Sequence, residues 1–339
     1  MKSGINLTLL AALSLTVLTL ASCGETRETI YLENTAPEES GLNLMKITDE
    51  NANTVGGASI QGYALTRNAL GLSLTEQCSW PSGRYLDVSP DGQEVAYLSK
   101  VDKQWNIMIR KAAAQGAATQ RSCRAVGDFS WGANGQLYFS DQGSGSYSQI
   151  SSTDAHAGTL MRQLTNNNTD INPILSKEQD KIYFTRVEQN GPFVWSYSLK
   201  DGALTACCKG FNPWPVKGSE FLCVRNSTNG MSEIWLVDYE AGKETLIVSD
   251  KNRGYTDPCL SPDGKWILMQ GNGKSSISKK SNLDIFAVKI DGTELIQLTY
   301  HPADDCCPVW SPDGKYIYFI SSRASKNSAF NVWRMRFSL

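Results

Sequence analysis

In this chain of 339 residues, the side chains best suited to catalysis or metal binding are the carboxylates and the two histidines, His156 and His301. Two histidines with nearby carboxylates can bind a transition-metal ion, and two carboxylates at a set separation can cleave a glycosidic bond. The densest acidic group is Asp304-Asp305, which follows His301 closely, and Asp257 occupies a similar segment earlier in the chain. His156 stands in the segment Asp-Ala-His-Ala-Gly, which is typical of an exposed turn. Because no third histidine and no Cys-x-x-Cys pair completes a ligand set, we expect neither a bound metal nor a cofactor.

The elements that must position these residues are set by a repeated turn. Ser-Pro-Asp-Gly occurs three times, and an apolar run rich in aromatic and β-branched residues follows each copy. Proline presets the first turn position and glycine adopts the positive φ of the last, so each copy predicts a hairpin turn followed by a strand. Three worn copies complete a series of six units of about 45 residues, whose turns end at positions 92, 135, 179, 218, 264 and 314.

Each unit also has a third strand with a central aromatic, as in Val194–Tyr197 and Ile234–Val237, and a fourth segment that often ends in Leu-Thr. Four antiparallel strands in 40–50 residues are typical of a propeller blade, so we predict an all-β, six-bladed β-propeller. The sixth unit ends after its third strand. Because an open ring would expose strand edges, we expect an N-terminal strand to close it, with Leu72–Thr75 favoured over Leu44–Thr48.

The N-terminal segment has the pattern of an export signal. Lys2 precedes an uncharged and mainly apolar stretch, and Leu20–Cys23 resembles a bacterial lipobox. The resemblance implies a signal peptide over residues 1–22, lipid attachment at Cys23, a polar tether over 23–60 and the propeller over 61–339. It places the protein in the bacterial cell envelope, as an outer-membrane lipoprotein that faces the periplasm or the cell surface. The alternative is a transmembrane helix in the same stretch.

Eight cysteines remain after Cys23, and an even number suits disulfides in an exported protein. The sequence does not settle their connectivity. Cys223 and Cys259 replace strand residues, and buried free thiols are the alternative for them. The candidates for disulfides, in which the two Cys-Cys pairs could bridge adjacent blades, are Cys78, Cys123, Cys207, Cys208, Cys306 and Cys307.

A ring of residues at the channel mouth follows from the repeat. Counting seven positions back from each turn end gives Tyr85, Asp128, Asn172, Phe211, Asp257 and Cys307. Such a mixed acidic and aromatic ring would bind a peptide, a glycan or a cation, whereas the alternative is that each Asp caps its own backbone turn. Trp214 departs from the register of the blade tryptophans, so we expect it to be a recognition aromatic. The complete candidate binding set is Asp128, Asn172, Phe211, Trp214, Tyr255, Asp257, His301, Asp304 and Asp305.

The repeat resembles the TolB-like (WD40-like) propeller family, on Ser-Pro-Asp-Gly-Lys, Ile-Tyr-Phe, Asp-Gly-Thr and Leu-Thr. It is similar also to the propeller domains of prolyl-type peptidases. The TolB resemblance covers about residues 75–339 and implies binding to envelope proteins. Peptidase activity would need a G-x-S-x-G elbow, which the chain lacks. Another relative, the propeller-type oligogalacturonate lyase, holds a metal with several histidines, but this chain has two histidines.

These observations predict a lipid-anchored binding or scaffold protein without catalytic activity, which uses one propeller face to bind an envelope protein or a glycan. The alternative is a carbohydrate-active enzyme, a polysaccharide lyase or a glycoside hydrolase, with channel carboxylates. The net charge is −2 and no basic cluster occurs. Because nucleic-acid binding depends on concentrated Lys and Arg, we expect no nucleic-acid partner.

Overall fold

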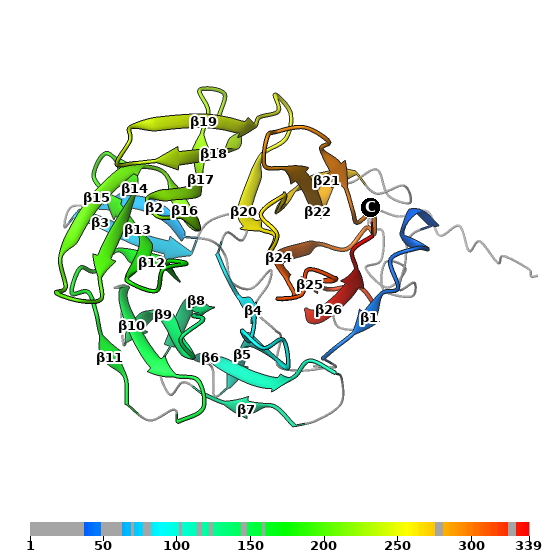
Figure 1. The fold of residues 1–339 in the computed structure, drawn as a ribbon, viewed down its shortest axis with the longest axis horizontal. Coiled ribbons are helices and arrows are strands. Elements are labelled where there is room, and N and C mark those ends of the chain that lie inside the picture. The colour runs from blue at the N-terminus through cyan, green and yellow to red at the C-terminus, as the bar shows by residue number, and fades with distance from the viewer. Residues whose placement is uncertain are drawn as a thin grey trace, which may run out of the picture.

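The computed structural model of the chain describes residues 37–48, 63–68, 71–76, 83–101, 104–113, 117–121, 125–143, 148–157, 160–274, 281–324 and 330–338. Within these ranges, six antiparallel sheets of four strands stand around a central axis, and a separate two-stranded sheet accompanies them (Figure 1). Each four-stranded sheet is one blade, and its first strand lies nearest to the axis. The prediction of an all-β, six-bladed propeller is confirmed.

The strands of the six blades follow one another in chain order. Blade 1 has β4 (Leu86–Val88), β5 (Glu94–Val101), β6 (Gln104–Lys111) and β7 (Thr119–Gln120); blade 2 has β8 (Ala125–Trp131), β9 (Gln136–Gly143), β10 (Gln149–Asp154) and β11 (Arg162–Gln163). Blade 3 has β12 (Asp170–Leu175), β13 (Lys181–Glu188), β14 (Gly191–Ser198) and β15 (Leu204–Lys209); blade 4 has β16 (Phe211–Lys217), β17 (Glu220–Asn226), β18 (Ser232–Asp238) and β19 (Lys243–Val248). Blade 5 has β20 (Tyr255–Leu260), β21 (Trp266–Lys274), β22 (Ser281–Lys289) and β23 (Ile296–Gln297); blade 6 has β24 (Asp305–Trp310), β25 (Tyr316–Ser321), β26 (Asn331–Arg336) and β1 (Met45–Lys46).

The Ser-Pro-Asp-Gly turns join the first and second strands of blades 1, 5 and 6. In each turn the Ser hydroxyl donates to the Asp carboxylate over 2.6 Å, and the Gly N–H donates to the Ser carbonyl. The turn-end residue has positive φ in all six blades, at positions 92, 135, 179, 218, 264 and 314. Glycine adopts this conformation at little cost, so the worn copies keep the backbone geometry after losing most of the motif.

Closure of the ring confirms one expectation and corrects another. An N-terminal strand does complete blade 6, but it is β1, in which Met45 pairs with Arg334 and Lys46 with Trp333. The favoured candidate, Leu72–Thr75, lies instead in β3 (Gly71–Glu76), which pairs with β2 (Tyr63–Asn68). The sheet of blade 6 therefore includes residues before position 61, within the segment that was expected to be a tether.

Hydrogen bonds and charges explain why residues 37–48, here called the N-terminal clasp, supply the closing strand. The clasp starts with a 3-10 turn, Pro37–Glu39. Thr48 donates its hydroxyl to the Asn331 side chain over 2.8 Å and accepts the Val332 N–H over 2.9 Å. Glu39, at the other end, forms a buried ion pair with Arg323 of blade 6. Buried polar groups need partners, and the clasp provides partners at both of its ends.

Aromatic side chains on the second strands form the core between the sheets. They are fully buried in five blades, and burying each one contributes about 1.5–3 kcal/mol. These residues are Tyr97, Phe139, Phe184, Phe221 and Phe319. This packing holds the blades at a fixed angle around the axis, so the first strands can line a common channel.

The recurring tryptophans of the third strands have a partner that the sequence did not indicate. Each of them lies against an arginine of its own blade. The ring-centre distances to the guanidinium carbon are 4.6 Å for Trp195 with Arg186, 5.0 Å for Trp235 with Arg225 and 5.8 Å for Trp333 with Arg323.

The predicted signal peptide and the lipidated Cys23 lie outside the described residues, as do Cys78 and Cys123. No helix among the described residues is long and apolar enough to cross a membrane.

Candidate functional site

The first strand of each of blades 2 to 6 is interrupted by a bulge where it passes the axis. Its pairing with the second strand shifts register between positions 126 and 129, 171 and 174, 211 and 214, 256 and 259, and 306 and 309. The bulged residue has positive φ at Asn172, Asn212, Asp257 and Cys307. Asn and Asp tolerate this conformation better than most residues, which accounts for their recurrence there.

Of the residues in the ring predicted from the turn spacing, Asn172, Asp257 and Cys307 occupy such bulges, and Phe211 lies one residue before the bulge of blade 4. Asn212, and not Phe211, occupies the bulge of blade 4. The reason is the turn of that blade, where Lys217 pairs with Glu220 across a two-residue loop, so the count from Gly218 is one residue too long. Phe211 instead pairs with Val224 and packs on the core.

Arg84, two residues before β4, reaches across the channel. Its guanidinium donates to the carbonyl of Pro173 in blade 3 over 3.1 Å and to that of Pro213 in blade 4 over 2.5 Å. It also lies 5.3 Å from the centre of the Trp214 ring. A side chain that starts at blade 1 and reaches blades 3 and 4 must cross the axis of the ring. Sequence reasoning missed Arg84, because its partners are distant in the chain and no motif surrounds it.

Three carboxylates surround this guanidinium, and each joins two blades. Asp87 of blade 1 accepts the Trp131 N–H of blade 2 over 2.7 Å. Asp128 of blade 2 accepts the backbone and side-chain N–H groups of Asn172 in blade 3, as well as the Ser140 hydroxyl. The predicted alternative, in which each Asp caps only its own turn, does not describe these contacts.

Asp257 makes the longest-range connection of the three. Its Oδ1 atom accepts the Gly83 N–H of the segment before blade 1 over 2.9 Å and the Asn212 amide of blade 4 over 2.6 Å. Burial raises the pKa of Asp257 to about 7 and the pKa values of Asp87 and Asp128 to about 6, although hydrogen bonds and Arg84 oppose the shift. The Arg84 guanidinium is therefore surrounded by three carboxyl groups whose raised pKa values disfavour ionisation.

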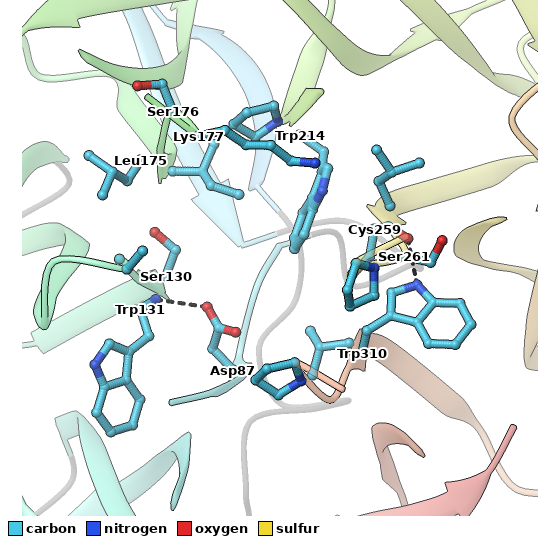
Figure 2. A pocket seen from close by; sticks show the side chains of 18 of the residues that line it. Asp87, Ser130, Trp131, Leu175, Ser176, Lys177, Trp214, Cys259, Ser261 and Trp310 are labelled. Atoms are coloured by element: carbon cyan, nitrogen blue, oxygen red, sulfur yellow. Dashed lines mark hydrogen bonds between the residues drawn. The ribbon is translucent and has the colours of Figure 1, made fainter. Parts of the chain in front are cut away.

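A pocket with a volume of about 270 Å³ opens where the first strands end at the Ser-Pro-Asp-Gly turns, and all six blades contribute to it (Figure 2). Its walls include the buried residues Leu175, Leu260 and Val309. In Figure 2 the Trp214 ring projects into the middle of the pocket, and the Asp87 carboxylate points toward Trp131 from the opposite side. Trp214 is half-buried, so one part of the ring stays open to solvent.

The rim of the pocket is exposed, and two polar groups of its lining residues have no hydrogen-bond partner among the described residues. The exposed rim residues are Ala133, Lys177, Pro262 and Pro312. The two polar groups are the Ser130 hydroxyl and the Trp131 indole N–H, both of them buried. The Trp310 indole, in contrast, donates to the Cys259 carbonyl over 3.1 Å. The pocket thus combines apolar walls, one available aromatic ring and few polar groups.

No protein-family model matches the sequence. Among curated proteins, the chain is 29% identical over 89 residues to the uncharacterized protein Atu1656 of Agrobacterium fabrum, which is 26% of this chain and 28% of that protein. It is 25% identical over 171 residues to the uncharacterized peptidase YuxL of Bacillus subtilis, which is 40% of this chain and 26% of that protein. The match thus spans about a quarter of the length of these relatives.

Solved structures share the architecture over most of the chain. Putative TolB from Agrobacterium tumefaciens superposes with a TM-score of 0.57 at 14% identity, over 78% of this chain and 92% of that one. TolB from Acinetobacter baumannii gives 0.57 at 16% identity, over 74% and 65%. The chain folds as a TolB-like six-bladed β-propeller. An oligogalacturonate lyase from Vibrio parahaemolyticus also superposes, with a TM-score of 0.54 at 9% identity over 88% and 97% of the two chains. At these identities the likeness concerns the fold.

Other predicted site residues of the TolB-like propeller lie away from the channel. Asp305 begins β24 and forms a buried ion pair with Arg323, which also binds Glu39 of the clasp over 2.9 Å. Burial, followed by repulsion from Asp305, raises the pKa of the neighbouring Asp284 to about 9. This cluster joins blade 6 to the clasp and is separate from the Arg84 network.

His301 and Asp304 belong to the same junction. The His301 Nδ1 atom accepts the Ala303 N–H over 3.0 Å, and Asp304 accepts the Leu283 N–H of blade 5 over 2.9 Å. Tyr255 is fully buried and packs edge-on against Phe286 at 5.5 Å. The predicted acidic and histidine residues therefore divide between two places, and no group of three or more His, Cys, Asp or Glu in the described part of the chain could hold a metal ion.

All six cysteines that the structure describes are free thiols. The predicted disulfides of Cys207, Cys208, Cys306 and Cys307 are therefore not formed in this structure. Cys207 and Cys307 stand at register shifts of β15 and β24, and the Cys306 thiol interacts with its neighbour Cys307. Cys223 and Cys259 are buried free thiols, which is the alternative that the sequence left open.

Proposed function

We propose that this TolB-like propeller is a lipid-anchored binding or scaffold protein of the bacterial cell envelope, and that the pocket at the Ser-Pro-Asp-Gly turns receives a partner protein. The observation that carries the proposal is a pocket that all six blades line and into which the Trp214 ring projects. A pocket that contains such an aromatic ring suits the capture of a projecting side chain. Tryptophan is among the residues that contribute most binding energy in protein interfaces.

The size and lining of the pocket favour a protein anchor over a sugar chain. Pockets for small molecules usually measure about 300–1,000 Å³, and this one has about 270 Å³. Sugar rings need several polar partners, whereas the walls here are mainly apolar. Exposed Pro262 and Pro312 on the rim can exclude water around an inserted side chain without losing much side-chain entropy.

The rival function is a carbohydrate-active enzyme that uses the channel carboxylates. The superposition with an oligogalacturonate lyase gives this alternative function some support. However, both oxygen atoms of Asp128 accept hydrogen bonds from Asn172 of blade 3. Asp257 accepts from Gly83 and Asn212 on Oδ1 and from Thr256 of its own blade on Oδ2, so both groups are bonded as structural carboxylates are. General acid–base chemistry would instead need carboxylates that face a substrate. The lipobox at Cys23 supports the envelope location, and the likeness to two TolB structures is consistent with it.

Site-specific photocrosslinking tests the proposed binding face. A photoreactive amino acid replaces exposed Lys177 on the pocket rim or, as a control, exposed Lys243 on the outer strand of blade 4. In membranes from the native host, we expect an adduct with one envelope protein from position 177 and none from 243. Trp214→Ala should lower the adduct yield at low partner concentration by about 30-fold, the effect of losing about 2 kcal/mol of binding energy.

Trp235→Ala is the matched control, because Trp235 is also half-buried and lies outside the pocket. It should leave the adduct unchanged. Equal adducts from positions 177 and 243, or an adduct that Trp214→Ala does not weaken, would contradict the binding face. Turnover of an oligosaccharide that Asp257→Ala abolishes would favour the enzyme instead.

A further inference from the structure

Two cysteines, Cys208 and Cys223, interact with Arg225 at the junction between blades 3 and 4. Cys207 and Cys208 lie near the end of β15, the outer strand of blade 3, and Cys223 lies on β17 of blade 4. Gly210 leads from β15 into blade 4, and a Cβ atom on it would stand 3.0 Å from the Cys223 Sγ atom. The end of β15 therefore passes directly beside β17.

Cys208 packs against the core cluster that contains Cys223. The two thiols interact across this junction, and Arg225 interacts with both. Arg225 is held in place, since it donates to the Lys209 carbonyl over 2.9 Å and to both oxygens of Glu244. Cys208 is half-buried, whereas Cys223 is fully buried. A reagent can thus reach the first thiol from solvent and would find the second directly behind it.

The charges around the pair make the two thiols unequal. The interaction with the Cys223 thiol lowers the pKa of Cys208; burial opposes this shift, and the contacts with Arg225 add to it. The interaction with Cys208 and burial raise the pKa of Cys223. Burial raises the pKa of Cys207 to about 12, which leaves that thiol protonated. The thiolate is the reactive form of cysteine, so Cys208 is the nucleophile of the three.

We infer that Cys208 and Cys223 are a redox-active pair that closes a disulfide between blades 3 and 4 when a hydroperoxide reaches Cys208. The Cys208 thiolate attacks one oxygen of the peroxide, so that a sulfur–oxygen bond forms and the oxygen–oxygen bond breaks. The products are a sulfenic acid on Cys208 and, from hydrogen peroxide, a hydroxide ion that takes up a proton to become water. Cys223 then attacks the sulfenic acid, the sulfur–sulfur bond forms, and the second oxygen leaves as water. Two thiols are oxidised by two electrons and one peroxide is reduced.

The disulfide would act on the strand that supplies the pocket. The cross-link encloses β16, which carries Trp214 of the pocket and Pro213, whose carbonyl accepts Arg84. In the disulfide the two sulfur atoms would stand about 2.05 Å apart, the length of the covalent bond. Oxidation therefore restrains the first strand of blade 4 without separating the blades.

Peptide mapping of the full chain after oxidation tests the inference. The protein is purified under reducing conditions, treated with one equivalent of hydrogen peroxide, blocked with N-ethylmaleimide and digested for mass spectrometry. We expect a linked Cys208–Cys223 peptide that dithiothreitol removes. In Cys223→Ser, dimedone should trap a sulfenic acid at Cys208. Arg225→Gln should slow this trapping about tenfold, the change in thiolate fraction for one pKa unit.

The controls separate this pair from general thiol oxidation. Cys259→Ser removes a buried thiol elsewhere and should leave the linked peptide unchanged. Unlinked Cys208 and Cys223 in the oxidised wild-type protein, or a Cys207–Cys208 peptide as the main product, would overturn the inference. The wild-type measurement decides the matter even where a variant fails to fold.

Discussion

Asp257→Asn is the sharpest test of how the channel is held together. Asp257 is 7% exposed in the bulge of β20. Its Oδ1 atom accepts N–H groups from Gly83 and Asn212, and an Asn side chain keeps an oxygen there. The Thr256 hydroxyl, which donates to Oδ2, can accept from the new amide instead. The substitution therefore preserves the shape and removes the ionisable group.

The pKa of Asp257 gives the size and the sign of the effect. Burial raises it from 3.8 to about 7, against the opposing hydrogen bond from Gly83 and the attraction of Arg84. Between these values the folded protein keeps a proton that the unfolded chain has lost, so the free energy of unfolding falls as pH rises. The contribution is fully present below about pH 4 and is lost as pH rises through about 7. Roughly three pKa units correspond to about 4 kcal/mol.

Urea unfolding of both proteins at pH 4 and pH 8, followed by circular dichroism, measures the effect. The unfolding free energy of Asp257→Asn, relative to that of wild type, should rise by about 2–4 kcal/mol between the two pH values. Asp263→Asn is the matched control in an exposed turn, where a hydrogen bond from Ser261 lowers the pKa of the carboxyl. That variant should lose stability at pH 8. Equal destabilisation by Asp257→Asn at both pH values would refute the reasoning.

Three further predictions follow from the two charged clusters and the N-terminus. Arg84→Met leaves three carboxylates without their cation and should lower the unfolding free energy by about 3–5 kcal/mol at pH 8 and by less at pH 5, as urea titrations would show. Glu39→Gln removes the negative charge that pairs with buried Arg323 and so weakens the attachment of the clasp to blade 6. The Ile47 amide of the clasp, which donates to the Val332 carbonyl, should then exchange hydrogen faster, while exchange in blade 3 stays unchanged. Cys23→Ala should abolish incorporation of labelled fatty acid in cells, whereas Cys259→Ala should retain it; a label that persists in Cys23→Ala would contradict the lipobox.

Much of the fold could be predicted because its determinants are local. A Ser-Pro-Asp-Gly turn forms through contacts within a few residues, and its repetition gives the number of blades and the order of their strands. The need to close the ring followed from the missing strand of the sixth unit. The sequence did not show whether Leu44–Thr48 or Leu72–Thr75 supplies that strand. The choice depends on the partners of Glu39 and Thr48, which lie nearly the whole chain away.

The candidate site was only partly predictable. The turn spacing located Asp128, Asn172 and Asp257 at the channel, and the irregular Pro-Trp-Pro segment drew attention to Trp214. The spacing failed at Phe211, where one hairpin is shorter. In the sequence, His301 and Asp305 resemble a catalytic cluster because they lie close together, but in the structure they belong to the junction between blade 6 and the clasp.

The sequence by itself determined the repeat, the propeller and the positions that can face its axis, because turn geometry and strand periodicity act over a few residues. Only the tertiary structure decided which side chains meet at the axis of the propeller. Arg84 meets Pro173 and Pro213 across 89 and 129 residues of chain. It also decided which thiols meet, since Cys208 and Cys223 lie on strands of different blades. Burial and charge pairing depend on which distant segments the closed ring brings together, and no local pattern contains that information.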